Sequence, residues 1–381
     1  MRIVFYYFKG GGGGLSNLLE LVRSIATQEK ESQLYVVSWL QADFSRLSDL
    51  SNVRVVPMRS RLPSEAVRLY YGLYGLNKFA RDIDADIIWS INTGAYIKGR
   101  IPQVLSINNA YQVYPWRHSA LHPAGFLRFV ALRLFSGLSI SAADLVLAQT
   151  SHMASLLEAK KAGCVRVLPK AVGWGSQNEG PNQAAESDSV ASTGARGWFT
   201  FVYVATLLPH KNHGAIIGAL EILRKEGKNI RVVTTLNQAE LVGQFGGAAR
   251  ELINEGRLVA AGWVEPQRLR QLYESCDASI NPSKIESLSS SHLEAMEWRR
   301  PLIASDLPYA RDLCGDAAVF VDPESTADIA SAMSMLANNH SLRSSLVSNG
   351  QEIMKKFSRN WAEVGREALA IFECVVLSKN G

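Results

Sequence analysis

The sequence is poor in cysteine and has no long hydrophobic segment. Its apolar runs are far shorter than the roughly 20 residues that span a bilayer, and Met1–Phe8 reads as a first β-strand rather than a signal peptide. A cytoplasmic protein is therefore expected. The few cysteines show neither metal-ligand spacing nor the density of a disulfide-rich domain, so we expect buried free thiols without redox chemistry. They are Cys164, Cys276, Cys314 and Cys374.

Acidic residues are missing from a long part of the first half of the chain. No Asp or Glu occurs from Ile87 to Ala143, whereas this stretch contains Lys98, Arg100, Arg117, Arg128 and Arg133. Residues 1–173 carry 20 Lys and Arg against 11 Asp and Glu, a net charge of +9, which leaves −4 for the remainder. Such a one-sided surface is expected to attract an anionic partner. Nucleic acid is the weaker candidate because no nucleic-acid-reading motif accompanies the charge.

Short apolar runs alternate with helix-period segments along most of the chain. This alternation is typical of an α/β protein with parallel sheets and crossover helices. The 381 residues, 47% of them hydrophobic, exceed one ordinary core. The stretch 175–197 has almost no large apolar residue and is predicted to be a flexible linker. We therefore predict one Rossmann-like domain at 1–174, a second at 198–356, and a C-terminal helix within 357–381 that can cross back to the first.

A run of five glycines, Gly10–Gly14, follows the first apolar run and precedes a helix-period segment. In a doubly wound sheet this is where ligands bind, because glycine lets phosphate or sugar approach the backbone amides. The run lacks the spacing of a dinucleotide-binding fingerprint, so a loose turn is the alternative.

The segment Pro209-His210-Lys211-Asn212 lies between an apolar run and a helix-period segment. Asn212 is a good helix cap. A lysine beside a helix N-terminus suits a diphosphate, because a fixed cation stabilises the charge that develops on a leaving group. A solvated lysine in a surface loop is the alternative.

Two glutamates, Glu286 and Glu294, lie eight positions apart on either side of the run Ser289-Ser290-Ser291, which opens a helix. This pattern suits a site that holds hydroxyls and phosphate. Ser291-x-x-Glu294 also fits a capping box, in which the glutamate would bond the cap residue instead of a ligand.

Together these motifs resemble the nucleotide-sugar half of retaining family 4 glycosyltransferases, strongly over residues 200–330 and only in topology before them. The resemblance implies the GT-B fold, in which two Rossmann-like doubly wound domains face each other across a cleft. It also implies a retaining transfer of a hexose from a nucleoside diphosphate sugar to a carbohydrate acceptor. No metal or other cofactor is expected, and Asp82-Ile-Asp84-Ala-Asp86 is interpreted as a solvated loop rather than a metal site.

The resemblance also assigns roles on the donor side. Lys211 stabilises the leaving diphosphate, Glu286 contacts the donor sugar near the reacting carbon, and Glu294 binds the ribose hydroxyls. The backbone of Val264 borders the base, and Trp263 either stacks on the base or faces the core. The serine run replaces a Gly-Leu-Pro-like turn, and its side chains are expected to narrow the pocket. Further donor-binding candidates are Gly12, Gly13, Gly14, His210, Ser289, Ser290 and Ser291.

Two family positions differ in this chain. Thr206 stands where many relatives have an arginine, and His210, Lys284 or a first-domain residue could replace it. Asn109 stands where many have a histidine near the donor sugar, and asparagine can orient a hydroxyl there without acting as a base. These departures support two alternatives: a sugar-nucleotide-binding partner subunit without catalysis, or an epimerase or hydrolase of the same fold.

The acceptor side is less defined. Its candidates are Tyr111, Trp116, Arg117, His118, Arg128 and Arg133. The helix-period segment 126–135 either packs on the sheet or contacts a membrane surface. The acid-free stretch favours a lipid-diphosphate-linked glycan, as in cell-surface polysaccharide or lipopolysaccharide synthesis, at the inner face of the cytoplasmic membrane.

Overall fold

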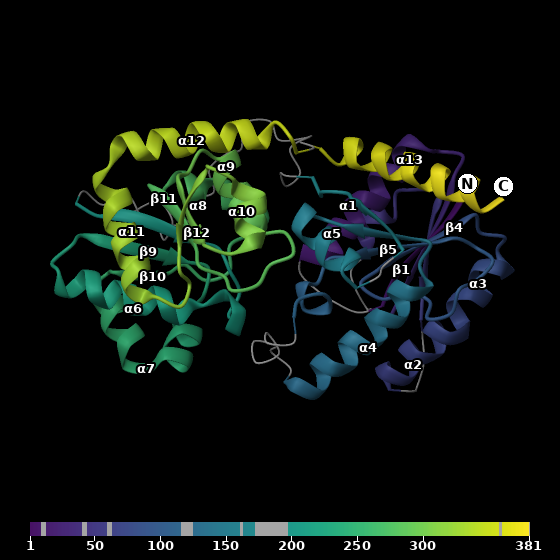
Figure 1. The fold of residues 1–381 in the computed structure, drawn as a ribbon, viewed down its shortest axis with the longest axis horizontal. Coiled ribbons are helices and arrows are strands. Elements are labelled where there is room, and N and C mark those ends of the chain that lie inside the picture. Colours follow the sequence, from purple (N-terminus) through teal and green to yellow (C-terminus); the bar gives the residue numbers. More distant parts are fainter. Residues whose placement is uncertain are drawn as a thin grey trace. The chain divides into compact units, whose positions relative to one another are not determined.

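The computed structural model describes residues 1–8, 13–39, 44–58, 63–115, 125–160, 163–171, 197–357 and 360–380. The chain forms two compact units (Figure 1): unit 1 comprises Met1–Ala171 and Ser358–Gly381, and unit 2 comprises Val172–Phe357. Each unit has a parallel sheet covered by helices on both faces. The predicted class of two doubly wound α/β domains is therefore confirmed. Of the predicted linker 175–197, only Gly197 lies within the described residues.

The sheet of unit 1 has the strand order β3-β2-β1-β4-β5-β6-β7, with all neighbours parallel. Its central strands are buried almost throughout, as expected where helices cover both faces. The strands are β1 (Arg2–Tyr7), β2 (Gln33–Ser38), β3 (Val53–Pro57), β4 (Ile87–Ile91), β5 (Gln103–Ile107), β6 (Leu145–Ala148) and β7 (Cys164–Val167).

Figure 1 shows α1 and α13 on one face of this sheet and α2, α3 and α4 on the other. The helices of unit 1 are α1 (Gly13–Gln28), α2 (Ser64–Tyr70), α3 (Leu76–Asp82), α4 (Phe126–Ala142), α5 (Ser151–Glu158) and α13 (Trp361–Asn380). Short 3₁₀ turns occur at Ser45–Leu47 and Ala110–Gln112, and a π-helical turn at Tyr71–Gly75 joins α2 to α3.

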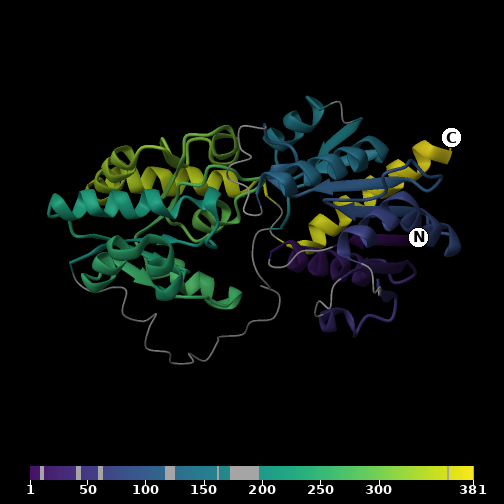
Figure 2. The same cartoon turned by 90° about the horizontal axis from the view of Figure 1, so that it is seen from below.

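The C-terminal helix α13 packs on α1 and completes the core of unit 1. Ala368 and Phe372 are fully buried, and the Phe372 ring meets Trp89 of β4 edge-on at a centroid distance of 4.9 Å. At the start of the helix, Ser24 Oγ of α1 donates to the carbonyl of Trp361 at 2.6 Å. Figure 2 shows this yellow helix among the purple and blue elements of unit 1.

The sheet of unit 2 has the order β10-β9-β8-β11-β12-β13, again parallel. Its strands are β8 (Phe199–Tyr203), β9 (Ile230–Thr234), β10 (Leu258–Ala260), β11 (Ala278–Asn281), β12 (Leu302–Ser305) and β13 (Ala318–Val321). Its helices are α6 (His213–Lys225), α7 (Gln238–Asn254), α8 (Pro266–Glu274), α9 (Ser290–Glu297), α10 (Pro308–Cys314), α11 (Thr326–Asn338) and α12 (His340–Met354), with a 3₁₀ turn at Pro209–Lys211. Helices α6, α7 and α11 cover one face, and α8, α9 and α10 the other.

In both units the strand order reverses beside the first strand, between β1 and β4 and between β8 and β11. At such a switch point the two crossover connections leave in opposite directions, and the crevice beyond the carboxyl ends of the strands is where these sheets bind ligands. In unit 2 the two loops that border this crevice carry Lys211 and Glu286.

The cysteine prediction is partly wrong. All four thiols are free, but only Cys276 and Cys314 are buried, whereas Cys164 and Cys374 are exposed. Cys164 opens the edge strand β7 and Cys374 lies on α13, so neither is covered by another layer. Among the described helices, none combines the length and the apolar character needed to cross a membrane.

Candidate active site

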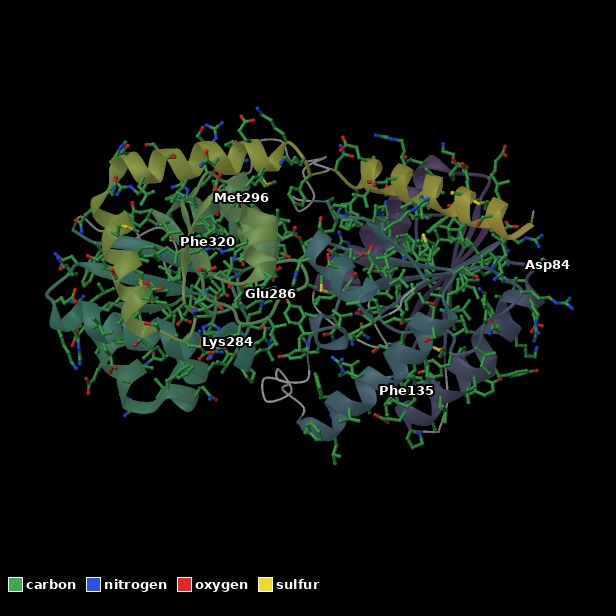
Figure 3. All side chains as sticks on the ribbon, in the orientation of Figure 1. Asp84, Phe135, Lys284, Glu286, Met296 and Phe320 are labelled. Atoms are coloured by element: carbon green, nitrogen blue, oxygen red, sulfur yellow. The ribbon has the colours of Figure 1, made fainter. Side chains whose placement is uncertain are left out.

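Lys211 and Glu286 form an ion pair at the switch point of unit 2. Lys211 Nζ lies 2.5 Å from Glu286 Oε1, and the two side chains are only 19% and 10% exposed. Residues 75 positions apart meet because β8 and β11 are neighbours, so their carboxyl-end loops converge. Lys211, predicted to contact the diphosphate, and Glu286, predicted to contact the donor sugar, are thus in direct contact. Figure 3 shows Glu286 and Lys284 in the same part of unit 2.

The ionised form of Glu286 is favoured despite its burial. Burial by itself raises the pKa of this carboxyl, but the charge and hydrogen bond of Lys211 oppose it, with a smaller contribution from His210. The net result is a pKa below the ordinary value of 4.5. Glu286 is therefore a carboxylate at neutral pH.

The loop that carries Lys211 is held by hydrogen bonds from side chains to backbone carbonyls. Asn212 adopts a left-handed conformation at φ 60° and ψ 36°, and its side-chain amide donates to the carbonyls of Pro282 (3.1 Å) and Pro323 (2.7 Å). Asn212 occupies the cap position of α6 as predicted, but its side chain makes no capping hydrogen bond and instead ties together the loops after β8, β11 and β13. The hydroxyl of Tyr203 donates to the Lys211 carbonyl, which fixes the backbone beneath the ammonium group.

Three histidines surround the ion pair, and only His210 was predicted from the sequence. Burial, with the charge of Lys211, lowers the pKa of His210 to about 4. Burial likewise lowers the pKa of His213 and of His292 to about 4. His213 Nε2 lies 3.1 Å from the Thr206 carbonyl, and His292 Nδ1 lies 3.6 Å from Cys314 Sγ. All three imidazoles are neutral at pH 7, so the positive charge at this site comes from Lys211. The sequence signal for His213 was its place one residue after the Lys211 motif.

The serine run faces inward. Asn281, at the end of β11, donates through Nδ2 to Ser289 Oγ at 3.0 Å and to Ser291 Oγ at 2.7 Å, and its Oδ1 accepts from the Ser283 amide at 3.1 Å. Both hydroxyls are buried. Ser289 and Ser291 therefore fasten the loop carrying Glu286 to the sheet, and the expectation that the serine side chains narrow the pocket stays a prediction. Ser290 is half-buried at the first position of α9.

Glu294 is not part of a capping box. The cap position of α9 is Ser289, whose side chain makes no capping bond, and Ser291 lies inside the helix. Glu294 is buried and its Oε2 accepts from the Tyr273 hydroxyl of α8 at 3.1 Å. The Tyr273 hydroxyl of α8 therefore holds the Glu294 carboxylate in a buried position, and this carboxylate does not cap the N-terminus of α9.

Around the predicted base-binding loop, Trp263 is 75% exposed, which excludes the alternative that it faces the core. Its indole nitrogen lies 3.3 Å from Glu265 Oε1. Val264 is half-buried against the core on the α8 side, and Gly262 takes a positive φ of 70° that turns the chain out of β10. Lys284 is paired with Glu324 at 2.7 Å, so its charge is already balanced.

In unit 1, some of the residues predicted from the sequence to bind a ligand make internal contacts, whereas Arg128 is exposed. Asn109 Oδ1 accepts from the Tyr111 amide at 3.0 Å and so caps the 3₁₀ turn after β5. Tyr111 is buried against Phe129, and Arg133 donates to the carbonyls of Tyr111 and Tyr114, so both belong to the internal packing of unit 1. Arg128 is exposed on α4.

The glycine run and the loop before α4 are only partly described. Gly13 opens α1, and a Cβ at Gly14 would lie 3.2 Å from the Tyr7 hydroxyl, a close approach that favours glycine. Gly12, Trp116, Arg117 and His118 lie outside the described residues.

The acidic triplet before β4 has partners within unit 1. Asp82 pairs with Lys78, Asp84 with Arg2 at 3.4 Å, and Asp86 accepts from the Arg2 amide at 2.7 Å. Within the described ranges, no group of three or more His, Cys, Asp or Glu is placed to hold a metal ion.

The structure has the GT-B fold. The Anabaena protein HepE, solved in complex with UDP and glucose, superimposes with a TM-score of 0.72 at 16% identity, covering 98% of this chain and 100% of HepE. Residues 191–353, which lie within unit 2, match the family model described as "Glycosyl transferases group 1".

Two curated relatives from Escherichia coli match part of the chain. Serotype-specific mannosyltransferase WbdA is 28% identical over 136 residues, which are 35% of this chain and 17% of WbdA. O-antigen chain mannosyltransferase B is 23% identical over 187 residues, 47% of each chain. This chain thus spans less than half the length of the curated relatives it matches.

The ion pair predicts a specific pH dependence of stability. Since the pKa of Glu286 is lowered in the folded protein, its contribution is present above its ordinary pKa and is lost as the pH falls through the folded pKa. Below about pH 4.5 the wild-type protein should therefore lose more free energy of unfolding than the Glu286→Gln variant. Chemical denaturation between pH 7 and pH 3 measures this difference.

The matched control is Glu352→Gln, which removes one partner of an exposed ion pair on α12. It should follow the wild-type pH profile, because exposed pairs contribute little. Parallel profiles for wild type and Glu286→Gln would show that the buried pair does not stabilise the fold.

Proposed function

We propose that this protein is a retaining glycosyltransferase that moves a hexose from a nucleoside diphosphate sugar to a glycan acceptor. The observation that carries this proposal is the buried Lys211–Glu286 pair at the switch point of unit 2. An ammonium group has three N–H donors, and Glu286 accepts from one, so others can reach a diphosphate. The group 1 family match over the same unit supports a nucleotide-sugar donor.

In the proposed reaction the bond between the sugar C1 and the diphosphate oxygen breaks, and the nucleoside diphosphate leaves with the electron pair. The acceptor hydroxyl forms a new bond to C1 on the same face of the sugar, and its proton passes to the departing diphosphate. Lys211 stabilises the charge that develops on the leaving oxygen. Glu286, ionised beside it, stabilises the positive charge that develops near C1 and orients the sugar hydroxyls.

The proposal includes catalysis without a metal ion, because Lys211 and the helix N-termini at the carboxyl edge of the sheet supply positive charge. Glu294 is assigned to the ribose hydroxyls, for which a buried carboxylate fixed by Tyr273 is a suitable acceptor. Asn109 is assigned to orienting a donor hydroxyl.

The acceptor is proposed to be a lipid-linked glycan in cell-surface polysaccharide synthesis, reached at the inner face of the membrane. The names of the two relatives support a surface polysaccharide. On α4, Leu127, Leu134 and Leu138 are exposed and follow helical spacing along one face, with Arg128 beside them. An apolar stripe with an adjacent cation in an acid-free region suits shallow contact with anionic lipid.

Glu286→Gln and Lys211→Ala should each reduce transfer by at least about 100-fold, the usual scale for losing one charge-stabilising group. Glu294→Ala should instead mainly weaken nucleotide affinity, because ribose contacts are made equally in the ground and transition states. Steady-state kinetics with a nucleoside diphosphate sugar found by thermal shift measures both effects. Near-normal turnover in both of the first variants would contradict the site assignment. Wild-type protein that binds nucleotide sugars without turnover would favour the binding-subunit alternative.

Chelation should leave transfer unchanged. After exhaustive treatment with EDTA, the rate should equal that of untreated enzyme, because the charge at the leaving group comes from the protein. A lost rate that Mg²⁺ or Mn²⁺ restores would contradict metal-independent transfer.

Replacing Leu127, Arg128 and Leu134 together by Gln should abolish sedimentation with phosphatidylglycerol vesicles at low salt while sparing nucleotide binding. Each cation near an anionic surface contributes on the order of 1 kcal/mol, and salt should weaken binding further. Leu377→Gln, at an equally exposed leucine on α13, is the matched control. If the wild-type protein does not sediment with such vesicles, a soluble acceptor becomes the better proposal.

A further inference from the structure

A small cavity lies wholly within unit 1, at the carboxyl edge of its sheet beneath α1 and α13. It has a volume of about 50 Å³, and its wall comes from α1, β4, β5, β6 and α13 together with the segment after β7. The cavity holds only a few water molecules or one small substituent. It is therefore too small for a whole sugar ring or a lipid chain.

The floor of this cavity is mainly apolar, although the buried Ser106 also lines the cavity. Leu18, Trp89, Leu147 and Val364 line it and are almost fully buried. The indole N–H of Trp89 donates to Ser106 Oγ at 2.6 Å, so the polar edge of that ring is already satisfied. A methyl group would gain contacts here, whereas a hydroxyl group would lose hydrogen bonds to water.

The described residues at the mouth of the cavity are polar, and Lys170 is the charged residue among them. Asn17, Asn108 and Gln149 line it with amide groups, and Lys170 lies beside them. Amides both donate and accept, which suits the mixed hydroxyls of a sugar ring. No carboxylate is among the described residues that line the cavity.

We propose that this cavity is an acceptor subsite, which takes a methyl-bearing substituent of the acceptor's terminal sugar into its floor while the amides at its mouth bind the ring hydroxyls. The substituent is the methyl of a 6-deoxy sugar or of an N-acetyl group. This inference rests on the proposed function, because only a transferase needs an acceptor subsite. It makes the cavity the determinant of which sugar is extended.

Ligand-observed saturation-transfer NMR with the full chain tests this subsite without requiring turnover. The probes are methyl glycosides in matched sets that differ only in the substituent: glucose, 6-deoxyglucose and N-acetylglucosamine, and the same sets in the galactose and mannose series. One set should show about tenfold tighter binding of its 6-deoxy or N-acetyl member than of its parent sugar, which carries the same methyl aglycone; this is the scale of one buried hydrocarbon group. The substituent's methyl protons should saturate most strongly. The 6-deoxy and N-acetyl members distinguish the two sources of the methyl.

A larger and a smaller side chain at Val364 test whether this cavity causes the preference for the substituent. Val364→Phe should fill the cavity and abolish the preference, whereas Val364→Ala should keep binding and tolerate a larger substituent such as N-propanoyl. Val375→Phe is the matched control, because Val375 packs on the same core from α13 but does not line the cavity. It should retain the wild-type preference.

The two proposals fail differently. Equal binding within every set, absence of binding in all sets, or a preference that survives Val364→Phe would overturn the subsite, even if nucleotide sugars bind unit 2 normally. Methyl-selective binding by a protein that neither binds nor turns over nucleotide sugars would instead overturn the transferase and leave a methyl-selective sugar site. Should Val364→Phe fail to fold, the wild-type comparison still decides the outcome.

Discussion

The ion pair between Lys211 and Glu286 constrains the whole carboxyl edge of unit 2. Removing two charges from water costs several kcal/mol per ion, so such a pair persists only when its geometry is held and further hydrogen bonds satisfy its atoms. The surrounding contacts meet this need. Tyr203 and Asn212 hold the backbone at Lys211, and Asn281 fixes the loop that carries Glu286. Removing either charge would leave the other buried without this counter-ion.

The neutral histidines follow from the same constraint. A third charge beside a buried, balanced pair would have no counter-ion, and burial lowers the pKa of His210, His213 and His292 to about 4. The site is therefore balanced before a ligand binds. In the proposed reaction an incoming diphosphate adds negative charge to this balanced site, and Lys211 is the side-chain cation that meets it.

Much of the fold could be predicted from the alternation of apolar runs and helical segments, because a parallel sheet buries whole strands and each crossover needs a helix. Lys211 and Glu286 could be chosen from motifs, but their contact depends on β8 pairing with β11, which no local pattern specifies. For a similar reason, the sequence alone could not predict that the side chains of Ser289, Ser291 and Arg133 point inward. A serine or arginine turns inward only if a partner such as Asn281 or the Tyr114 carbonyl lies there, and those partners come from other elements.

The packing of α13 on α1 also affects how the protein is made. Unit 2 is continuous in sequence, whereas unit 1 needs a helix that is synthesised after the whole of unit 2. Domains generally fold as units while the ribosome releases the chain from its N-terminus. Residues 1–171 leave the ribosome before α13 is made, so the part of this face that Ala368 and Phe372 cover beside α1 is exposed at that stage. Unit 2 can thus reach its folded state first, although it comes second in the gene, and the nascent unit 1 must keep an exposed apolar face until its last helix arrives.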